Sequence, residues 1–398
     1  MLPPVSKRDL VANFDGWATD DAVRRETAEA FVADPGQVGH YYLGRYLAFA
    51  TSGTTGRPAV FLHDRDAVNV YAALMLARRL PSLIAAGAKA SFLENRGRTA
   101  TIITTGGHFT SSVIEAFARS RFPRLSGRNR TFSLLAPLPD LVRALNEYQP
   151  AVIGSYPTAL AVLAGEQAAG RLRIRPALAL SGAERLSPAA AERIKASFPC
   201  PLRDTYAASE FMGIAFDCRY GRLHLNADWV ILEPVDAALR PVPPGIPSHS
   251  TLLTNLANRV QPVIRYDLGD SVTMLPARCP CGSPLPLVRP DGRRDEILYL
   301  GSPGGGEIPV IPLVLATVVE ETAGILGYQV IRVGPGLLRV RVDEAPGYDR
   351  ARVCDDLLRR LREHLASVDL ASVVVELAGE RPVRDPSGGK MRQFYAER

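Results

Sequence analysis

Short apolar runs alternate with longer helical patterns, and this alternation constrains the fold more than any other feature of the sequence. Residues 151–154 have the character of a buried strand, and a turn at 155–158 leads into an apolar helix. The order repeats where the strand-like run 177–180 precedes a helix that opens at Ser187-Pro188, with proline in its first turn. Strand followed by helix, more than once, predicts parallel sheets covered by helices.

The length of 398 residues exceeds the size at which one hydrophobic core keeps growing, so two or more domains are expected. From Trp229 the sequence changes to strands and turns rich in proline and glycine, and beyond about Asp295 a unit of alternating helices and strands begins. We therefore expect an α/β fold. Residues 1–294 would form a large N-terminal domain of mixed and parallel sheets covered by helices, with a β-rich subdomain. Residues 295–398 would form a small, mobile α+β C-terminal domain.

Composition excludes several classes of protein. No apolar run reaches about eighteen residues and no secretory signal is evident, so we expect a cytoplasmic protein with no membrane partner. The five cysteines fit a reducing compartment. The net charge of +6 is modest, and basic residues are not interleaved with stacking aromatics, so we expect no nucleic-acid partner. The oligomeric state is open, with a homodimer among the alternatives.

Hydroxyl groups and glycines gather in the segment 51–58, between the strand-like runs 46–50 and 59–62. Glycine lets main-chain N–H groups approach a ligand closely, and Ser and Thr hydroxyls add donors for phosphoryl oxygens. The segment lacks the lysine of the Walker A pattern and does not open a helix. A phosphate-binding loop and a plain polar hairpin are both compatible with these residues.

Lysine is rare in a chain with 47 lysines and arginines, since it occurs only at Lys7, Lys89, Lys195 and Lys390. Arginine can replace lysine at an exposed position, but not where a compact ammonium must reach one point charge. Lys390 lies in the glycine-containing run 387–392 near the C-terminus. A flexible loop of this kind is a suitable place for a mobile catalytic cation, so Lys390 is the candidate.

Five further motifs follow the loop in order, at 181–184, 204–210, 262–270, 292–296 and 388–390. Together with 51–58 they resemble the adenylate-forming superfamily of acyl-CoA synthetases, adenylation domains and luciferases. The chain most resembles the short phenylacetate-CoA ligase branch, and the resemblance covers nearly the whole chain from about Tyr46. Any one motif is weak evidence, whereas six in the right order are specific.

The resemblance implies an ATP-dependent ligase that activates a small carboxylic acid as acyl-AMP, releases pyrophosphate and transfers the acyl group to an acceptor. Aromatic acids are favoured, and CoA is the leading acceptor. An amine, a carrier-protein thiol, or an aryl amine treated with ATP-activated nitrite, as in related diazotases, are the alternatives. A nucleotide-binding scaffold without turnover is the alternative of a different class.

The family's functional residues carry over to matching positions in this sequence. The resemblance implies that Glu210 holds Mg²⁺, that Asp270 binds the ribose hydroxyls and that Lys390 is catalytic. It places adenine between the Tyr206 segment and the turn 182–184. The predicted ATP and AMP site comprises Thr51, Ser52, Gly53, Thr54, Thr55, Gly56, Ser181, Gly182, Ala183, Glu184, Asp204, Thr205, Tyr206, Ala207, Ser209, Asp270 and Arg293.

Cys218, His224, Cys279 and Cys281 form a second set, with the spacings Cys-x5-His and Cys-Pro-Cys-Gly. Three thiolates and one imidazole are a ligand set that holds tetrahedral Zn²⁺, and four protein ligands leave no open position for catalysis. The resemblance to the phenylacetate-CoA ligase branch favours a structural zinc knuckle within 218–281. Buried cysteines that simply pack are the alternative.

The acid-binding pocket is less well defined by the sequence. By analogy it lies between the loop 106–109, Tyr156 and the strand end 181–183, with His108, Phe109 and Tyr156 as its candidate contacts. Aromatic and apolar residues in these loops favour an aryl or arylacetic acid. A lone histidine is more often structural, so both roles are open for His108.

Some positions depart from the family's pattern. Alanine replaces the usual glycine at Ala183 and Ala207, which adds methyl groups beside the expected adenine or acyl pocket. The segment 301–306 does not reproduce the glycine motif of the family's pantetheine channel, which leaves the acceptor open. By resemblance, Asp295 is the hinge about which the C-terminal domain closes for adenylation and rotates for transfer.

Overall fold

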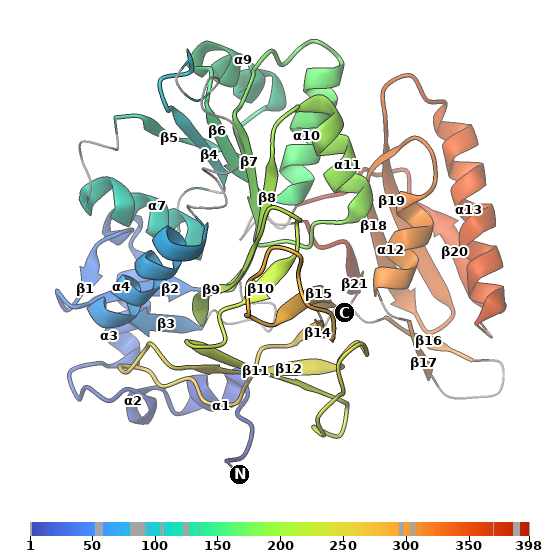
Figure 1. Cartoon of the computed structure of the whole chain (residues 1–398). Helices are drawn as coiled ribbons and strands as arrows, with labels where there is room; N and C mark the ends of the chain where they lie inside the picture. Colours follow the sequence, from blue (N-terminus) through green and yellow to red (C-terminus); the bar gives the residue numbers. More distant parts are fainter. Residues whose placement is uncertain are drawn as a thin grey trace.

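The computed structural model describes residues 2–51, 59–79, 92, 94–103, 105, 107–121, 127–134, 136–293, 298–302, 307–310, 312–368, 370–384 and 391–397. Within these ranges, every helix is too short or too polar to span a membrane. The chain forms a central mixed sheet covered by helices, two small sheets beside it, and a C-terminal lobe with a sheet of its own (Figure 1). The expected α/β fold class is confirmed.

The central sheet has nine strands in the order β14-β15-β10-β9-β8-β7-β6-β4-β5. They are β4 (Thr99–Ile103), β5 (Asn129–Ser133), β6 (Val152–Ser155), β7 (Leu178–Gly182), β8 (Leu202–Ala208), β9 (Phe211–Asp217), β10 (Leu223–Leu225), β14 (Asp270–Leu275) and β15 (Leu287–Arg293). Neighbours from β5 to β8 pair in parallel, whereas the pairs from β8 to β14 are antiparallel. The parallel half coincides with the strand-then-helix units that the sequence predicts.

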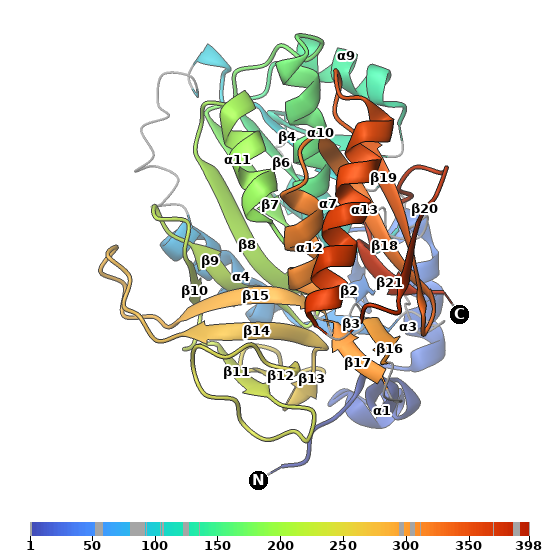
Figure 2. The same cartoon turned by 90° about the vertical axis from the view of Figure 1, so that its right-hand side faces the viewer.

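The helices α9 (Leu138–Tyr148), α10 (Pro157–Ala168) and α11 (Pro188–Ser197) cover the parallel half, as Figure 2 shows. Apolar side chains of α10 and α11, including Leu160 and Ile194, share one core with Ile153 of β6. Helix α11 begins as predicted, with proline in its first turn. Its cap is the hydroxyl of Ser187, which accepts from the N–H of Ala190 at 3.2 Å.

The N-terminal part begins with α1 (Lys7–Ala12), α2 (Phe14–Trp17), α3 (Arg25–Ala33) and the 3-10 turn η1 (Pro35–Gln37). An antiparallel sheet follows, made of β1 (Tyr41–Tyr42), β2 (Tyr46–Ala50) and β3 (Val60–His63). Ala50 pairs with Val60, so the phosphate-loop candidate joins two antiparallel strands, as predicted.

Further elements complete the N-terminal part around the central sheet. Helix α4 (Arg65–Leu74) continues as the π-helical turn η2 (Met75–Arg79), and α7 (Thr110–Arg121) follows β4. The second small sheet consists of β11 (Val230–Val235), β12 (Ser250–Asn255) and β13 (Tyr266–Asp267). Strands of this sheet and of the central sheet share one hydrophobic core, in which Leu253 and Val272 are fully buried.

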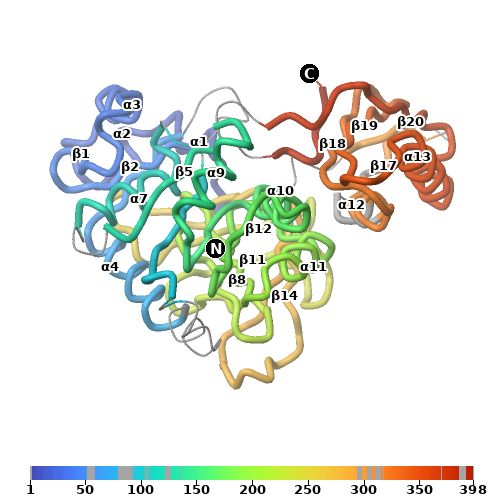
Figure 3. The backbone as a smooth tube through the Cα atoms, turned by 90° about the horizontal axis from the view of Figure 1, so that it is seen from above, coloured from blue at the N-terminus to red at the C-terminus, as the bar shows by residue number. Residues whose placement is uncertain are grey.

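The C-terminal lobe, as we call residues 298–397, has its own sheet in the order β20-β19-β18-β21. Its elements are β16 (Leu298–Gly301), β17 (Glu307–Val310), α12 (Pro312–Glu320), β18 (Ile325–Gly334), β19 (Leu337–Glu344), α13 (Arg350–Ser367), β20 (Val374–Leu377) and β21 (Phe394–Ala396). Figure 3 shows the lobe set to one side of the rest of the chain. Its buried residues form a separate core. The lobe docks on α11, where Arg193 donates to the carbonyls of Ile325 at 2.7 Å and Leu326 at 3.1 Å.

Candidate active site and metal cluster

Predicted site residues gather where the parallel strands β7 and β8 end side by side. Gly182 and Thr205 are register partners there, and the hydroxyl of Ser181 donates to Asp204 at 2.6 Å. A Cβ on Gly182 would lie 3.3 Å from the carbonyl oxygen of Thr205, so glycine lets the two strand ends approach closely. In open α/β sheets, ligands bind at this carboxyl edge of the strands.

Asp270, the first residue of β14, is held by two side chains. The hydroxyl of Tyr206 donates to Oδ2 at 2.7 Å, and Nη1 of Arg293 donates to Oδ1 at 2.9 Å. Burial, followed by the charge of Asp270, raises the pKa of Tyr206 well above its ordinary value, so the phenol remains a donor. A carboxylate has about four acceptor positions, so Asp270 can also accept ligand hydroxyls in a fixed orientation.

Glu210 is buried at the turn between β8 and β9, with 6% of its surface exposed. Burial raises the pKa of this carboxyl, whereas a hydrogen bond from the Tyr266 hydroxyl and the charge of Arg293 act in the opposite direction. Tyr266 comes from β13 and lies in the motif 262–270, in which the sequence alone predicts no role for the tyrosine. A buried carboxylate with partial charge compensation is a donor that fits a hard cation such as Mg²⁺.

Glu184 connects three segments of the chain. Its Oε2 accepts from the N–H of Thr158 at 3.3 Å and from the Thr158 hydroxyl at 2.7 Å, at the first turn of α10. Its Oε1 accepts from the N–H of Met391 in the C-terminal lobe at 3.0 Å. The preceding residue, Ala183, has a φ of +66°, a left-handed conformation that favours glycine. The departure from the family's glycine therefore also places alanine in a strained backbone.

Seven predicted site residues lie outside the described residues: Ser52, Gly53, Thr54, Thr55, Gly56, Asp295 and Lys390. Thr51 is described and closes the base of the loop. Its N–H donates to the carbonyl of Ala59 at 2.9 Å, and its Oγ1 accepts from the N–H of Ala59 at 3.1 Å. Met391, which follows Lys390 in the sequence, contacts Glu184 at the strand ends.

The end of β8 next to the site is irregular. The register between β8 and β9 shifts between Tyr206 and Ala208, where Ala207 lies opposite the three residues 212–214 of β9, so the extra residues of the bulge belong to β9. Ser209 follows, and its hydroxyl lies 2.8 Å from that of Thr110 at the start of α7. A bulge beside a binding site turns side chains away from the directions that regular strand alternation would give them.

The candidates for the acid pocket lie in different surroundings. His108 is buried against Phe31 of α3, with ring centroids 5.4 Å apart, and burial lowers the pKa of its imidazole. Phe109 lies over Gly107, where a Cβ would come within 2.9 Å of its ring. Tyr156 is buried directly before α10. The ring of His108 thus faces α3.

The four residues of the predicted zinc set come together, and their ligand atoms lie within 4.8 Å of one another. The sulfurs of Cys218 and Cys279 are 3.6 Å apart, and that of Cys281 is 3.3 Å from Nε2 of His224. Nδ1 of His224 lies 3.2 Å from the carbonyl of Leu285. A carbonyl only accepts, so Nδ1 carries the proton and Nε2 faces the sulfurs with a free lone pair. The donor set fits a tetrahedral zinc ion.

The metal-ligand cluster and Glu210 lie at opposite ends of strand β9. Glu210 precedes β9 and Cys218 follows it, so about 25 Å of extended chain separates them. Cys279 and Cys281 come from the connection between β14 and β15, and His224 comes from β10. The cluster therefore brings β9, β10 and the β14–β15 connection together, away from the residues predicted to bind the nucleotide.

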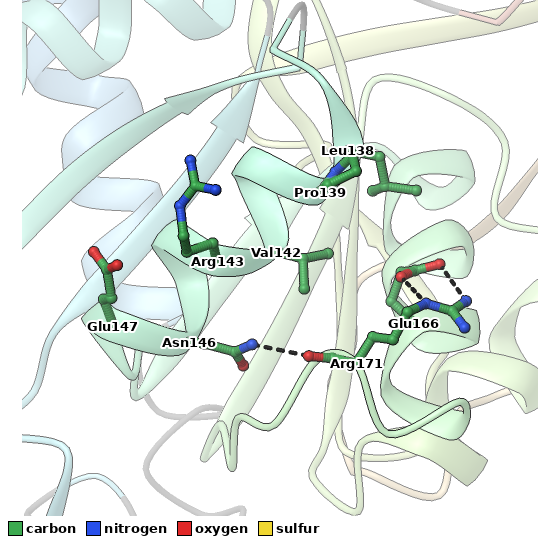
Figure 4. A pocket seen from close by; sticks show the side chains of 8 residues that line it. All are labelled: Leu138, Pro139, Val142, Arg143, Asn146, Glu147, Glu166 and Arg171. Carbon is green, nitrogen blue, oxygen red and sulfur yellow. Dashed lines mark hydrogen bonds and ion pairs between the residues drawn. The ribbon is translucent and has the colours of Figure 1, made fainter.

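A separate hollow of 630 Å³ lies between α9 and the end of α10 (Figure 4). Two of its charged groups are paired with each other, since Arg171 binds Glu166 through two hydrogen bonds of 2.7 and 2.8 Å. Asn146 donates to the carbonyl of Arg171 at 2.9 Å. None of the residues that line it belongs to the predicted site.

The fold is that of adenylate-forming acyl-CoA ligases. One similar solved structure is 2-hydroxyisobutyryl-CoA ligase in the postadenylation state with 2-HIB-AMP. The match covers all of this chain and 80% of the chain of that ligase, with 18% identity and a TM-score of 0.66. The same enzyme with 2-HIB-AMP and CoA in the thioesterification state gives a TM-score of 0.52.

In sequence, the chain is similar to the phenylacetate-coenzyme A ligase of Thermus thermophilus, with 25% identity over 374 residues, 86% of this chain and 79% of that protein. The expected resemblance to this branch is confirmed. The amide bond synthetase McbA from Marinactinospora thermotolerans also shares the fold, with 15% identity over 86% of this chain and 67% of its own, and a TM-score of 0.56. No family model matches the chain.

Proposed function

We propose that this chain is an AMP-forming ligase that activates a small carboxylic acid with ATP and releases pyrophosphate. The observation that carries the proposal is the pair of acidic residues at the carboxyl edge of the sheet. Asp270 is oriented by Tyr206 and Arg293, and the buried Glu210 lies on the neighbouring turn. Similarity to a phenylacetate-coenzyme A ligase supports the same reaction class.

Each acidic residue has a distinct role in this proposal. Asp270 accepts hydrogen bonds from the ribose hydroxyls, because its carboxylate is fixed and surrounded by donors. Glu210 holds Mg²⁺, which when bound would neutralise charge on the triphosphate. The attacking carboxylate and the α-phosphate are both anions, so the 51–56 loop and the ammonium of Lys390 supply further compensation.

CoA is the acceptor that the similarities favour, since the phenylacetate and 2-hydroxyisobutyryl ligases carry it in their names. The amide bond synthetase neighbour supports an amine as the alternative. A carrier-protein thiol and a nitrite-dependent diazotase reaction remain further alternatives. We divide the chain into a nucleotide-binding domain, residues 1–294, and a domain of residues 295–398 that moves about Asp295 between the two half-reactions.

We further propose that Cys218, His224, Cys279 and Cys281 hold a structural Zn²⁺. The proposal is supported by the spacing of the four donors and by the hydrogen bond that leaves Nε2 of His224 free to ligate. The ion would have no open coordination position. Metal analysis after gentle purification should find about one equivalent of zinc; less than half an equivalent would refute the assignment.

The decisive experiment is mass spectrometry of the products formed from ATP, Mg²⁺, a library of aryl, arylacetic and short hydroxy acids, and CoA. An acyl-CoA together with AMP is expected. Acyl-AMP without thioester would keep the adenylation step and exclude CoA, after which amines are tested. If no acid supports pyrophosphate exchange and nitrite also fails, the ligase proposal is wrong. Calorimetric ATP binding without AMP formation would then identify a non-catalytic scaffold.

A further inference from the structure

The turn that carries Glu210 has a shape that its own sequence does not explain. Ala208 of β8 pairs with Phe211 of β9, so Ser209 and Glu210 form a two-residue hairpin connection. Such connections favour residues with positive φ, typically Asn-Gly. Ser209 and Glu210 both have negative φ. The conformation of this turn must therefore be imposed by contacts with other parts of the chain.

Two side chains from distant strands hold the carbonyl groups of the turn. Nε2 of His63, at the end of β3, lies 2.8 Å from the carbonyl oxygen of Ser209. Nδ2 of Asn255, at the end of β12, donates to the carbonyl oxygen of Glu210 at 2.8 Å. The hydroxyl of Tyr71 from α4 joins them, at 3.0 Å from Nδ1 of His63 and 2.9 Å from Nδ2 of Asn255.

The direction of every hydrogen bond in this group is fixed by chemistry. Oδ1 of Asn255 accepts from the N–H groups of Ala257 and Asn258, which fixes the orientation of its amide, so Nδ2 donates both to Tyr71 and to the turn. A carbonyl cannot donate, so Nε2 of His63 carries the proton and Nδ1 accepts from the Tyr71 hydroxyl. Each donor and each acceptor then has one consistent role.

The group is also closed to water. His63 is fully buried, and Tyr71 and Asn255 are exposed by 7% and 5%. The ring of Phe49 lies 5.1 Å from that of His63, and the ring of Phe211 lies 4.9 Å from that of Tyr71. Hydrogen bonds in such apolar surroundings are strong, and a missing partner cannot be replaced by solvent. The three side chains therefore act as one rigid support.

We propose that His63, Tyr71 and Asn255 are positioning residues that hold the Ser209–Glu210 turn, and so aim the Glu210 carboxylate at the metal-bound phosphates of ATP. The inference rests on the proposed function for the role of Glu210. The support of the turn itself rests on the contacts alone. None of the three residues reaches the substrate in this assignment, so they act through Glu210.

The test compares Tyr71→Phe, which deletes only the central hydroxyl, with Tyr148→Phe, a matched deletion at the end of helix α9. The Tyr148 hydroxyl donates to the carbonyl of Arg128 at 2.8 Å, away from the turn. Hydrogen–deuterium exchange is measured without ligand on the peptide that spans 205–214. Faster exchange at the turn in Tyr71→Phe, with no change there in Tyr148→Phe, is expected. Equal exchange in both variants would overturn the inference.

The second part of the test measures how ATP–pyrophosphate exchange depends on Mg²⁺. In Tyr71→Phe the Mg²⁺ concentration for half-maximal ATP–pyrophosphate exchange should rise about tenfold, with the KM for the acid unchanged. His63→Gln keeps a donor for the Ser209 carbonyl and should be less impaired than His63→Leu. An unchanged Mg²⁺ requirement in Tyr71→Phe would refute the positioning role. If the wild type shows no exchange, the proposed function fails, and hydrogen exchange alone decides whether the three residues hold the turn.

Discussion

The two ends of strand β9 hold reactive groups in opposite ways. At one end Glu210 is buried without full charge compensation, and its turn is held by side chains from β3, α4 and β12. At the other end Cys218 lies in a complete set of four donors. The first arrangement leaves one carboxylate in need of a partner, whereas the second would surround a metal ion with four protein donors. We call the Glu210 end of β9 the open end and the Cys218 end, where four donors converge, the closed end.

The largest effect is expected from Glu210→Gln, which removes the charge at the open end and keeps the shape. Pyrophosphate exchange should fall about 10²–10³-fold. The free energy of unfolding should not fall, because the buried charge is a cost to the fold. Exchange assays and urea denaturation measure the two quantities. Glu192→Gln, at an exposed position on α11, is the control and should change neither.

Cys279→Ser breaks the closed end instead. We expect loss of the bound metal and a decrease of about 3 kcal/mol in the free energy of unfolding, because a four-ligand site contributes directly to folding. Elemental analysis and denaturation check this prediction. Cys354→Ser, in the C-terminal lobe, should retain the metal. Full stability of Cys279→Ser after complete zinc loss would mean that the cluster does not stabilise the fold.

The open end should also respond to acid through His63. Burial lowers the pKa of His63 from 6.5 to about 4, so below pH 6.5 the unfolded chain binds a proton that the folded chain does not. The resulting stability is complete above pH 6.5 and is lost as the pH falls towards 4. Between pH 7 and pH 5 the loss should be about 2 kcal/mol. Denaturation of the wild type and of His63→Gln at both pH values isolates the contribution of His63. An equal loss of unfolding free energy between pH 7 and pH 5 in the two proteins would contradict the prediction.

The smallest effect concerns the two alanines that replace family glycines. Ala183→Gly should stabilise the fold by up to about 1 kcal/mol, because it relieves a left-handed alanine. Ala207→Gly should destabilise it by about 0.5–1 kcal/mol, because Ala207 lacks a positive φ and glycine only adds flexibility. Thermal melts of the two variants compare them directly. Changes of the same sign would show that backbone strain at Ala183 is not what distinguishes the two sites.

The closed end of β9 could be predicted from sequence because its signals are local. Cys279 and Cys281 lie on one turn, and Cys218 and His224 flank another. Glu210 and Asp270 could likewise be predicted, because each lies in a short motif of the sequence. The support of the turn could not be predicted, because His63 is 146 residues from Ser209, and Tyr71 is 184 residues from Asn255. Each of these side chains is ordinary in its own segment and gains its role only when three sheets and a helix meet.

The hydrogen bonds that Arg193 and Glu184 make to the described part of the C-terminal lobe go to its main chain, at the carbonyls of Ile325 and Leu326 and at the N–H of Met391. A main-chain partner persists whatever side chain occupies its position. These contacts should therefore tolerate sequence drift on the lobe, with proline at 391 as an exception, while Arg193 and Glu184 themselves tolerate little. Covariation between positions would not reveal such a junction. A mutational scan would detect Arg193 and Glu184 but not most of their partner positions on the lobe.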